Sequence, residues 1–522
     1  YYYDFMKTSY DDEYMPSTAS PSATLSINAL PVDKISQLSS IEETGDLLLA
    51  GKYLMIIGYS TISAYDISKP DQPQKVWDIK TDNSTQIYQS RLLNDKLYLI
   101  TSTGIYSQPS CPIPLLTNGQ QEISISCTDI YHPSESIDID STYTVMQIDP
   151  ASGKIANQIS FLGSYDSTLY MSPDNIYIGY SQSGDYIQLF NQFLTEHDQI
   201  FSSDFSYKIN RLNSYDLSRA AKMLEMETIL SQYTATLGQD DRLKFNNDLN
   251  NAVSDFIAKH KRELSSTVIN KISIADFSVV ATGSIPGTLL NQFSLDEADD
   301  ALRVATTTDQ NWAMSMFSLP SSESVNDVYV LDNKLNITGS VLDLGQGERI
   351  YSVRFIGDKG YVVTFKETDP FYVLDLSDTA KPRRVGELKI PGYSSYLHPL
   401  SDNLILGIGR EDSNVKLSLF DVSNPAQPKE VAKYSLTEYW SDVLNTHHAF
   451  MQDEKNQLFF IPGSAGGYIF SYADNTLSLS KTISSISAQR ALFINNYLYI
   501  IGQDEIVIVD ENSLERVNSL IL

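Results

Sequence analysis

Short alternations of apolar and polar residues dominate this chain. Eight times an apolar segment is followed by a polar turn and a second apolar segment, as in LLLAGKYLMIIG from Leu47 and VRFIGDKGYVVTF from Val353. Alternation around a turn rich in Gly, Asn and Asp is typical of a β-hairpin. The predicted hairpins begin at Leu47, Arg91, Leu169, Phe293, Val353, Tyr396, Ala449 and Ala491.

A further strand follows each hairpin and ends at an aspartate. From Asp332 onward these aspartates recur at intervals of 43, 46, 53 and 36 residues, close to the roughly 40–50 residues of a four-stranded propeller blade. Asp followed by Ser, Asn or Pro turns the chain by bonding its own backbone, so we interpret these residues as turn formers and not as catalytic groups. They are Asp66, Asp149, Asp276, Asp332, Asp375, Asp421, Asp474 and Asp510.

This repeat predicts an all-β fold, a β-propeller over residues 41–522. Eight blades are favoured and seven are the alternative, because the repeat that ends near Asp474 departs from the pattern. Closure into a ring leaves only short strand edges unpaired, whereas an open sheet of this size would aggregate. The length of 522 residues does not require several domains, since each blade buries its faces only against its neighbours.

Residues 1–40 lack the β pattern and mix Ser, Thr, Pro and Asp with clustered tyrosines. Such a composition predicts an extended N-terminal segment. One interpretation is a linker from an anchor. The other is a tyrosine-rich strand that pairs with a neighbouring molecule or closes the ring.

Residues 202–266 show helical spacing instead of alternation. One apolar stripe contains Leu217, Ala220, Ala221 and Leu224, a second runs from Phe245 to Phe256, and Gly238 separates them. We therefore expect a hairpin of two antiparallel helices, inserted in blade three and packed on its rim, with stripes too narrow for a core of their own. Such an insertion either carries partner contacts or covers a strand edge.

The charge balance is strongly acidic, with 37 Lys and Arg against 65 Asp and Glu and a net charge of −28. This sign disfavours nucleic acid as a partner, because a negative surface repels phosphate backbones. Solubility alone explains the charge, and attraction of divalent cations or basic proteins is the alternative. The chain has no run of eighteen apolar residues and begins at Tyr1 without Met, so we expect a processed or truncated chain without a membrane span, with any anchor upstream.

The two cysteines, Cys111 and Cys127, flank a turn within one long connection. A disulfide there would close the loop and stabilise it by about 3 kcal/mol, provided that the protein resides in an oxidising compartment. Two free thiols are the alternative.

Two groups of residues are candidate metal ligands. Asp296, Glu297, Asp299 and Asp300 lie in one hairpin turn and suit Ca²⁺, which needs about six to eight converging oxygen ligands. A solvated acidic turn is the alternative. His398 and the pair His447–His448 fall on the inner hairpins of neighbouring blades and could bind a transition metal across the central channel, with Asp442 or Glu411 nearby in sequence. The alternative is that these histidines bond to the backbone of the channel wall.

Several phrases resemble a known family. TVINKISIADFSVV from Thr267, RIYSVRFIGDKGYVVTFKETDPFYVLDLSD from Arg349 and HHAFMQDEKNQLFFIP from His447 are similar to the secreted β-propeller-domain family of archaea and bacteria, which is distantly similar to WD repeats. The resemblance covers roughly residues 41–522. It implies a secreted or cell-surface protein, often anchored near its N-terminus, without an established enzymatic activity.

No motif for a nucleophile, a phosphate loop or a catalytic metal occurs in the sequence. We therefore expect no enzymatic activity and no catalytic residue, and a function in binding a protein partner or copies of this chain outside the cell. The alternative is an extracellular polysaccharide hydrolase or lyase, which requires two carboxylates about 5–10 Å apart at the channel mouth.

Overall fold

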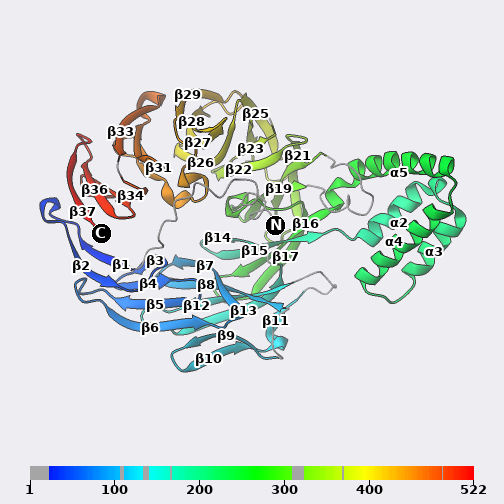
Figure 1. The fold of residues 1–522 in the computed structure, drawn as a ribbon, viewed down its shortest axis with the longest axis horizontal. Coiled ribbons are helices and arrows are strands. Elements are labelled where there is room, and N and C mark those ends of the chain that lie inside the picture. Colours follow the sequence, from blue (N-terminus) through cyan, green and yellow to red (C-terminus); the bar gives the residue numbers. More distant parts are fainter. Residues whose placement is uncertain are drawn as a thin grey trace.

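The computed structural model of the chain describes residues 23–105, 111–132, 140–164, 167–308, 323–366, 369–484 and 486–522. Their strands form eight sheets of four or more strands, which follow one another around a ring with a helical body outside it (Figure 1). Each sheet contains one of the hairpins predicted from the sequence. The fold is a β-propeller, which confirms the predicted fold class.

The first four sheets contain the following strands. The first sheet consists of β3 (Asp46–Ala50), β4 (Tyr53–Ile57), β5 (Thr61–Asp66), β6 (Gln74–Thr81), β9 (Ile113–Asn118) and β10 (Gln121–Ile125). The second consists of β7 (Thr85–Leu93), β8 (Lys96–Gly104), β11 (Ile130–Tyr131), β12 (Ser141–Ile148) and β13 (Ile155–Gly163). The third consists of β14 (Ser167–Met171), β15 (Asn175–Ser183), β16 (Ser265–Ser273) and β17 (Val279–Pro286). The fourth consists of β18 (Leu295–Ala298), β19 (Ala301–Thr308), β20 (Val325–Leu331) and β21 (Ile337–Leu344).

The other four sheets have four strands each. The fifth consists of β22 (Arg349–Ile356), β23 (Lys359–Phe365), β24 (Asp369–Asp375) and β25 (Arg383–Ile390). The sixth consists of β26 (Tyr393–Ser401), β27 (Leu404–Glu411), β28 (Asn414–Asp421) and β29 (Lys429–Leu436). The seventh consists of β30 (Met451–Asp453), β31 (Leu458–Gly463), β32 (Gly466–Ser471) and β33 (Ser478–Ser484). The eighth consists of β34 (Ala488–Ile494), β35 (Tyr497–Gly502), β36 (Glu505–Asp510) and β37 (Arg516–Ile521).

The hydrophobic core of the ring lies between neighbouring sheets. Phe371 of the fifth sheet and Phe420 of the sixth stack with their ring centroids 4.5 Å apart, and both are fully buried. Phe460 of the seventh sheet shares a cluster with Val507 of the eighth. The first strand of each sheet lies nearest the centre of the ring (Figure 1). Because the apolar side chains pack between neighbouring sheets, this strand can present polar groups to the centre.

The aspartates that end the repeated strands form the predicted turns. Asp375 accepts hydrogen bonds from the backbone N–H of Ser377 and, at 2.7 Å, from its hydroxyl. These bonds and the Arg383 guanidinium lower the pKa of Asp375. Asp421 and Asp510 accept corresponding backbone bonds. The interpretation as turn chemistry is confirmed at these positions.

A hairpin of β1 (Thr24–Asn28) and β2 (Ser36–Ile41) lies between the last sheet and the first (Figure 1). Tyr499 donates a 2.6 Å hydrogen bond to the Ala29 carbonyl, and Asn518 donates one of the same length to Val32 in η1 (Val32–Lys34). At its other end Ile41 packs with Ile56 and Tyr65 of the first sheet. Residues 24–41 thus join the two ends of the ring, while the clustered tyrosines of residues 1–22 lie outside the described residues.

The helical insertion differs from the prediction. Four helices between β15 and β16 replace the expected pair, and they span residues 186–260. They are α2 (Tyr186–Glu196), α3 (Ser203–Asn213), α4 (Arg219–Thr236) and α5 (Gln239–His260). The first three begin at side-chain caps, in which Asp185, Ser202 and Ser218 accept backbone hydrogen bonds.

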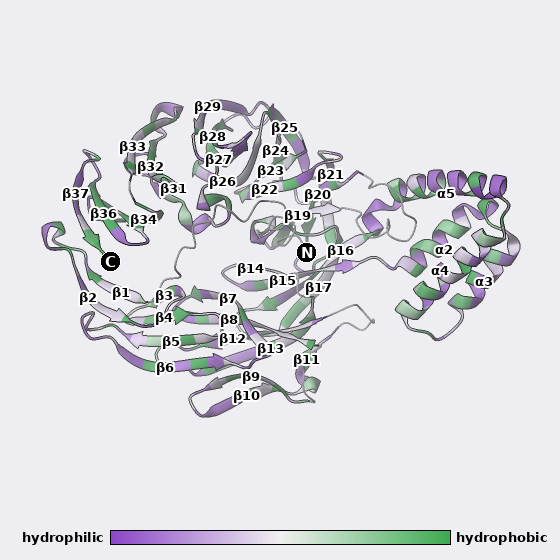
Figure 2. Cartoon of the chain, viewed as in Figure 1, coloured by the Kyte–Doolittle hydropathy of each residue, from purple (hydrophilic) through white to green (hydrophobic). Residues whose placement is uncertain are grey.

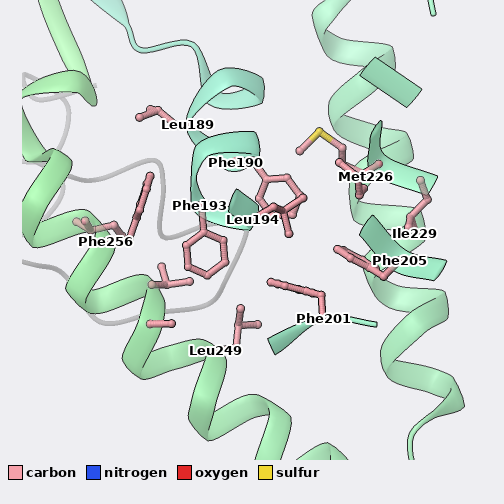
Figure 3. Close-up of a cluster of buried hydrophobic side chains, with 14 of the residues drawn as sticks. Leu189, Phe190, Phe193, Leu194, Phe201, Phe205, Met226, Ile229, Leu249 and Phe256 are labelled. Carbon is pink, nitrogen blue, oxygen red and sulfur yellow. The ribbon is translucent and has the colours of Figure 1, made fainter. Parts of the chain in front are cut away.

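The four helices enclose a core of their own, so the expectation that they pack only on the rim of blade three is wrong. Figure 3 shows Phe193, Phe205 and Met226 pointing toward one another from three of the helices. In Figure 2 hydrophobic and hydrophilic residues alternate along the helices, as amphipathic helices around a shared core require. Within the described residues, no helix is long and apolar enough to cross a membrane.

Candidate functional site

The centre of the ring contains a cavity of about 490 Å³. Its wall is built from the first strands β7, β14, β22 and β26, and from the short helices η6 (Gln292–Ser294), η7 (Asp442–Leu444) and η8 (His447–Ala449). Six of the eight sheets, or the segments that lead into them, therefore contribute to one site.

The first strands share a bulge that shapes the cavity wall. Pairing with the second strand of the sheet skips one residue in β7, β22, β26 and β34, namely Tyr88, Tyr351, Ser395 and Gln489. A bulge bends its strand and redirects the side chains beside it. Tyr88 and Gln89 of β7, together with Ser395 and Tyr396 of β26, consequently line the cavity.

Two arginines contact residues of the cavity wall. Arg91 of β7 donates a 2.7 Å hydrogen bond from Nη2 to Gln292 Oε1. The Arg354 guanidinium of β22 lies over the ring of Phe293 at 4.1 Å and over Tyr396 at 5.9 Å. Burial lowers the pKa of both arginines from its ordinary value, which leaves them cationic at neutral pH because that value is so high.

The predicted histidines are engaged with neighbouring side chains. His398 Nδ1 lies 2.9 Å from the Tyr396 hydroxyl, and His398 Nε2 lies 2.9 Å from Gln452 Oε1. Burial lowers the pKa of His398 to about 4. The imidazole is therefore neutral at pH 7, with Nε2–H donating to Gln452 and Nδ1 accepting from Tyr396.

His447 lines the cavity, and its ring lies 4.0 Å from that of His448 and 5.3 Å from that of Phe293. Burial, with the adjacent His448 and nearby arginines, lowers the pKa of His447 to about 4. Of the two acids proposed to assist these histidines, Glu411 pairs with Lys433 and Asp442 is exposed in η7.

The four candidate calcium ligands do not converge on one point. Asp296 is bonded to Arg303, whereas Glu297 contacts Lys271 Nζ at 3.2 Å and Asn175 Nδ2 at 2.9 Å. Burial acts to raise the pKa of Glu297, but hydrogen bonds from its neighbours, chiefly Ser172, bring it below its ordinary value.

The other two, Asp299 and Asp300, form an exposed turn with positive φ angles of 51° and 61°. Asp300 also borders an open hollow of about 610 Å³ between the third and fourth sheets. In the part of the chain that the structure describes, no three His, Cys, Asp or Glu side chains gather as a metal-binding group. Binding of calcium or of a transition metal stays a prediction.

The two cysteines lie at disulfide distance. Cys111 and Cys127 have Cα atoms 5.9 Å apart and sulfur atoms within bonding distance. Their loop adjoins β9 and β10, which extend the first sheet at its outer edge.

The hydrolase alternative requires two accessible carboxylates. Asp453 and Glu511 form a close pair, but they are buried, with exposed fractions of 7% and 5%. Asn456 holds the pair, donating at 2.7 Å to Asp453 Oδ2 and also to Glu511 Oε1. Burial and the neighbouring Asp453 carboxylate raise the pKa of Glu511. This pair joins the seventh sheet to the eighth and does not line the cavity.

We predict that Glu511→Gln stabilises the protein at pH 7 by about 1 kcal/mol, since it removes a buried charge beside Asp453. Because the pKa of Glu511 is raised in the folded state, the wild type loses stability as the pH rises through that pKa. The advantage of Glu511→Gln over the wild type should therefore vanish at low pH, where Glu511 is protonated. Urea unfolding at pH 4 and pH 7 would measure this, with the exposed Glu515→Gln as control. Destabilisation at pH 7 would contradict the prediction and indicate that the contacts of Glu511 with Lys455 and Asn456 outweigh its repulsion by Asp453.

Comparison with known proteins identifies the family of this chain. The profile of the beta propeller domain matches residues 9–514. The chain belongs to the beta propeller domain family. This confirms the resemblance seen in the sequence phrases, while the secreted location that the resemblance implies stays a prediction.

Two relatives support the family assignment. An uncharacterized protein of Archaeoglobus fulgidus is 44% identical over 495 residues, covering 95% of this chain and 77% of that protein. An uncharacterized protein of Methanocaldococcus jannaschii is 37% identical over 502 residues, covering 95% and 78%.

Two solved structures are similar only at a low level. Apo AztD from Citrobacter koseri has a TM-score of 0.40 at 11% identity, covering 90% of this chain and 94% of that one. Dihydro-heme d1 dehydrogenase NirN has a TM-score of 0.42 at 9% identity, covering 92% and 75%. At these TM-scores, we infer nothing about this propeller from the two structures.

Sequence reasoning found His447 in the cavity wall but missed the arginines and polar side chains around it. Arg91 and Arg490 are each the one charged residue of their first strand, and Arg354 shares its first strand with Arg349. A charged residue in such a strand signals a position that faces the channel and not a neighbouring sheet. That signal was present in the sequence, but only the ring shows that the three strands meet.

Proposed function

We propose that this chain is a non-enzymatic binding module at the cell exterior, which uses its helical body to bind a protein partner or another copy of the chain. The observation that carries the proposal is the separate core of the helices, which gives a preformed body projecting from the ring (Figure 1). A preformed surface loses little conformational freedom on binding.

An apolar surface on this body is available for contact. Leu217 is 46% exposed and Leu224 is 67% exposed, and Ala220 and Ala221 beside them on α4 are exposed as well. These residues are the apolar stripe seen in the sequence, whereas Met226 and Ile229 of the same helix are buried. Leu217 lies just before the N-cap of α4, and the other three residues lie in the first two turns of this helix. Exposed apolar residues that lie close together are typical of an interaction surface.

The remaining features agree with this proposal. The net charge of −28 suits a soluble exterior protein, and cysteines at disulfide distance suit an oxidising compartment. Two of the clustered acidic residues have structural partners, in the ion pairs of Asp296 with Arg303 and of Glu297 with Lys271.

We predict that the double variant Leu217→Ser/Leu224→Ser weakens association by about tenfold, because both exposed leucines leave the contact. Light scattering over a range of concentrations would measure self-association. Leu243→Ser is a matched control, since Leu243 is 66% exposed on α5 but lies between Arg242 and Lys244. Equal association of both variants and the wild type would contradict the role of this surface, and turnover of an extracellular polysaccharide would contradict a non-enzymatic function.

A further inference from the structure

The centre of the ring is cationic although the chain is strongly acidic. Arg91, Arg354 and Arg490 come from the first strands of the second, fifth and eighth sheets. In the described ranges, none of these three arginines has a carboxylate oxygen within 4 Å, whereas Arg262, Arg303 and Arg383 are all in ion pairs. Arg91 bonds to Gln292 and Arg354 lies over Phe293, both in the cavity wall. The strand of Arg490 contacts η8, which contains His447 of the same wall.

Nearby carboxylates offset only part of this charge. Asp46 of β3 acts on Arg91, and Asp296 acts on Arg354. Asp296 is already bonded to Arg303, so it offsets the charge of Arg354 only in part. Because the sheets around the channel have a low dielectric constant, the excess positive charge attracts an anion more strongly there than at an exposed surface.

Two buried polar atoms in the cavity wall lack a partner. Gln89 Oε1 and Ser395 Oγ have no hydrogen bond, and both residues line the cavity. Ser395 is the bulged residue of β26, and Gln89 follows the bulge of β7. Buried polar atoms are satisfied in most native structures, so an unpaired acceptor and an unpaired hydroxyl on opposite strands indicate a ligand with hydroxyl groups.

We propose that the central cavity binds a small hydroxylated carboxylate of the size and chemistry of a hexuronate. The arginines that flank the cavity wall donate hydrogen bonds to the carboxylate, for which the guanidinium fork is suited. Gln89 Oε1 accepts a hydrogen bond from a ligand hydroxyl, and Ser395 bonds a second. The volume of about 490 Å³ lies within the roughly 300–1,000 Å³ of ligand pockets.

The apolar part of the wall suits the carbon faces of such a ligand. Tyr88, Leu290 and Leu444 line the cavity beside the polar groups, and aromatic and aliphatic side chains pack against the C–H faces of a sugar ring. This site goes beyond the protein-binding role proposed above and does not depend on the helical surface, so either can fail without the other.

Titration calorimetry on the full chain with glucuronate and glucose tests the proposal, because the two sugars differ in the carboxylate. Glucuronate should bind at millimolar concentration or below, and glucose about tenfold more weakly or not at all. Arg490→Gln should weaken glucuronate binding by about tenfold. This arginine is exposed, so its loss should leave the fold intact. Arg383→Gln is the control, since Arg383 pairs with Asp375 away from the cavity.

A second variant separates the hydroxyl contacts from the charge. Gln89→Leu should weaken glucuronate binding and leave acetate binding unchanged, because acetate has no hydroxyl group to donate to Gln89. Thermal unfolding of each variant would check that the fold is intact. Equal binding of glucose and glucuronate, no binding of glucuronate, or unchanged affinity in Arg490→Gln would each overturn the proposal.

Discussion

Replacement of Arg262 by alanine is expected to lower the free energy of unfolding by about 3 kcal/mol. Arg262 lies in η5 (Lys261–Glu263), where the helical body returns to the ring. Its Nε and Nη2 atoms donate to the two carboxylate oxygens of Asp327 at 2.7 and 2.8 Å. Asp327, on β20 of the fourth sheet, is fully buried. Without the arginine, a buried carboxylate would keep hydrogen bonds from Tyr329 and from the Asp343 backbone but have no cation.

Chemical denaturation would measure this loss. The double variant Arg262→Ala/Asp327→Asn should recover part of it, because the amide is not charged. Arg383→Ala is the control, since its ion pair with Asp375 leaves the arginine side chain 72% exposed and exposed pairs contribute about 0–1 kcal/mol. Equal losses for Arg262→Ala and Arg383→Ala would show that this junction does not fix the helical body to the ring.

Phe205→Ala is expected to destabilise the helical body by about 4 kcal/mol. Phe205 is 1% exposed, and its ring centroid lies 4.7 Å from that of Phe201 (Figure 3). It lies 5.1 Å from the ring centroid of Tyr233. Because the helices have their own core, the loss should stay within residues 186–260. Hydrogen exchange should then show faster exchange in α2–α5 and unchanged protection in the ring strands.

The matched control is Tyr207→Ala on the same helix. Tyr207 is 62% exposed, so its removal should change stability by less than about 0.5 kcal/mol. A loss of protection in the ring strands of Phe205→Ala equal to that in the helices would mean that ring and helices unfold as one unit, which would contradict the separate core.

The strand repeat was readable from the sequence because its signals are local. Alternation fixes which side chains face a neighbouring sheet, and an aspartate such as Asp375 forms its turn with the next two residues alone. The resemblance of the repeated phrases added the family. None of these signals depends on residues far apart in the chain.

The helical body was predicted only in part, because the stripe from Phe245 to Phe256 is buried but the other predicted stripe is not. Leu217 and Leu224 have helical spacing but are exposed, whereas Met226 and Ile229 enter the core. The start of the body was missed because a run such as YIQLFNQFLTE from Tyr186 is as apolar as a strand. Its N-cap, Asp185, was the local signal for a helix.

The sequence by itself determined the all-β class, the position of the turns and the presence of an insertion, since spacing and turn chemistry act over a few residues. Only the tertiary structure decided which charges meet. Arg91 and Arg490 are 399 residues apart in the chain of 522, and closure of the ring brings both toward the cavity beside His447. Such convergence depends on the number, order and tilt of all the sheets together, and no local pattern of residues encodes it.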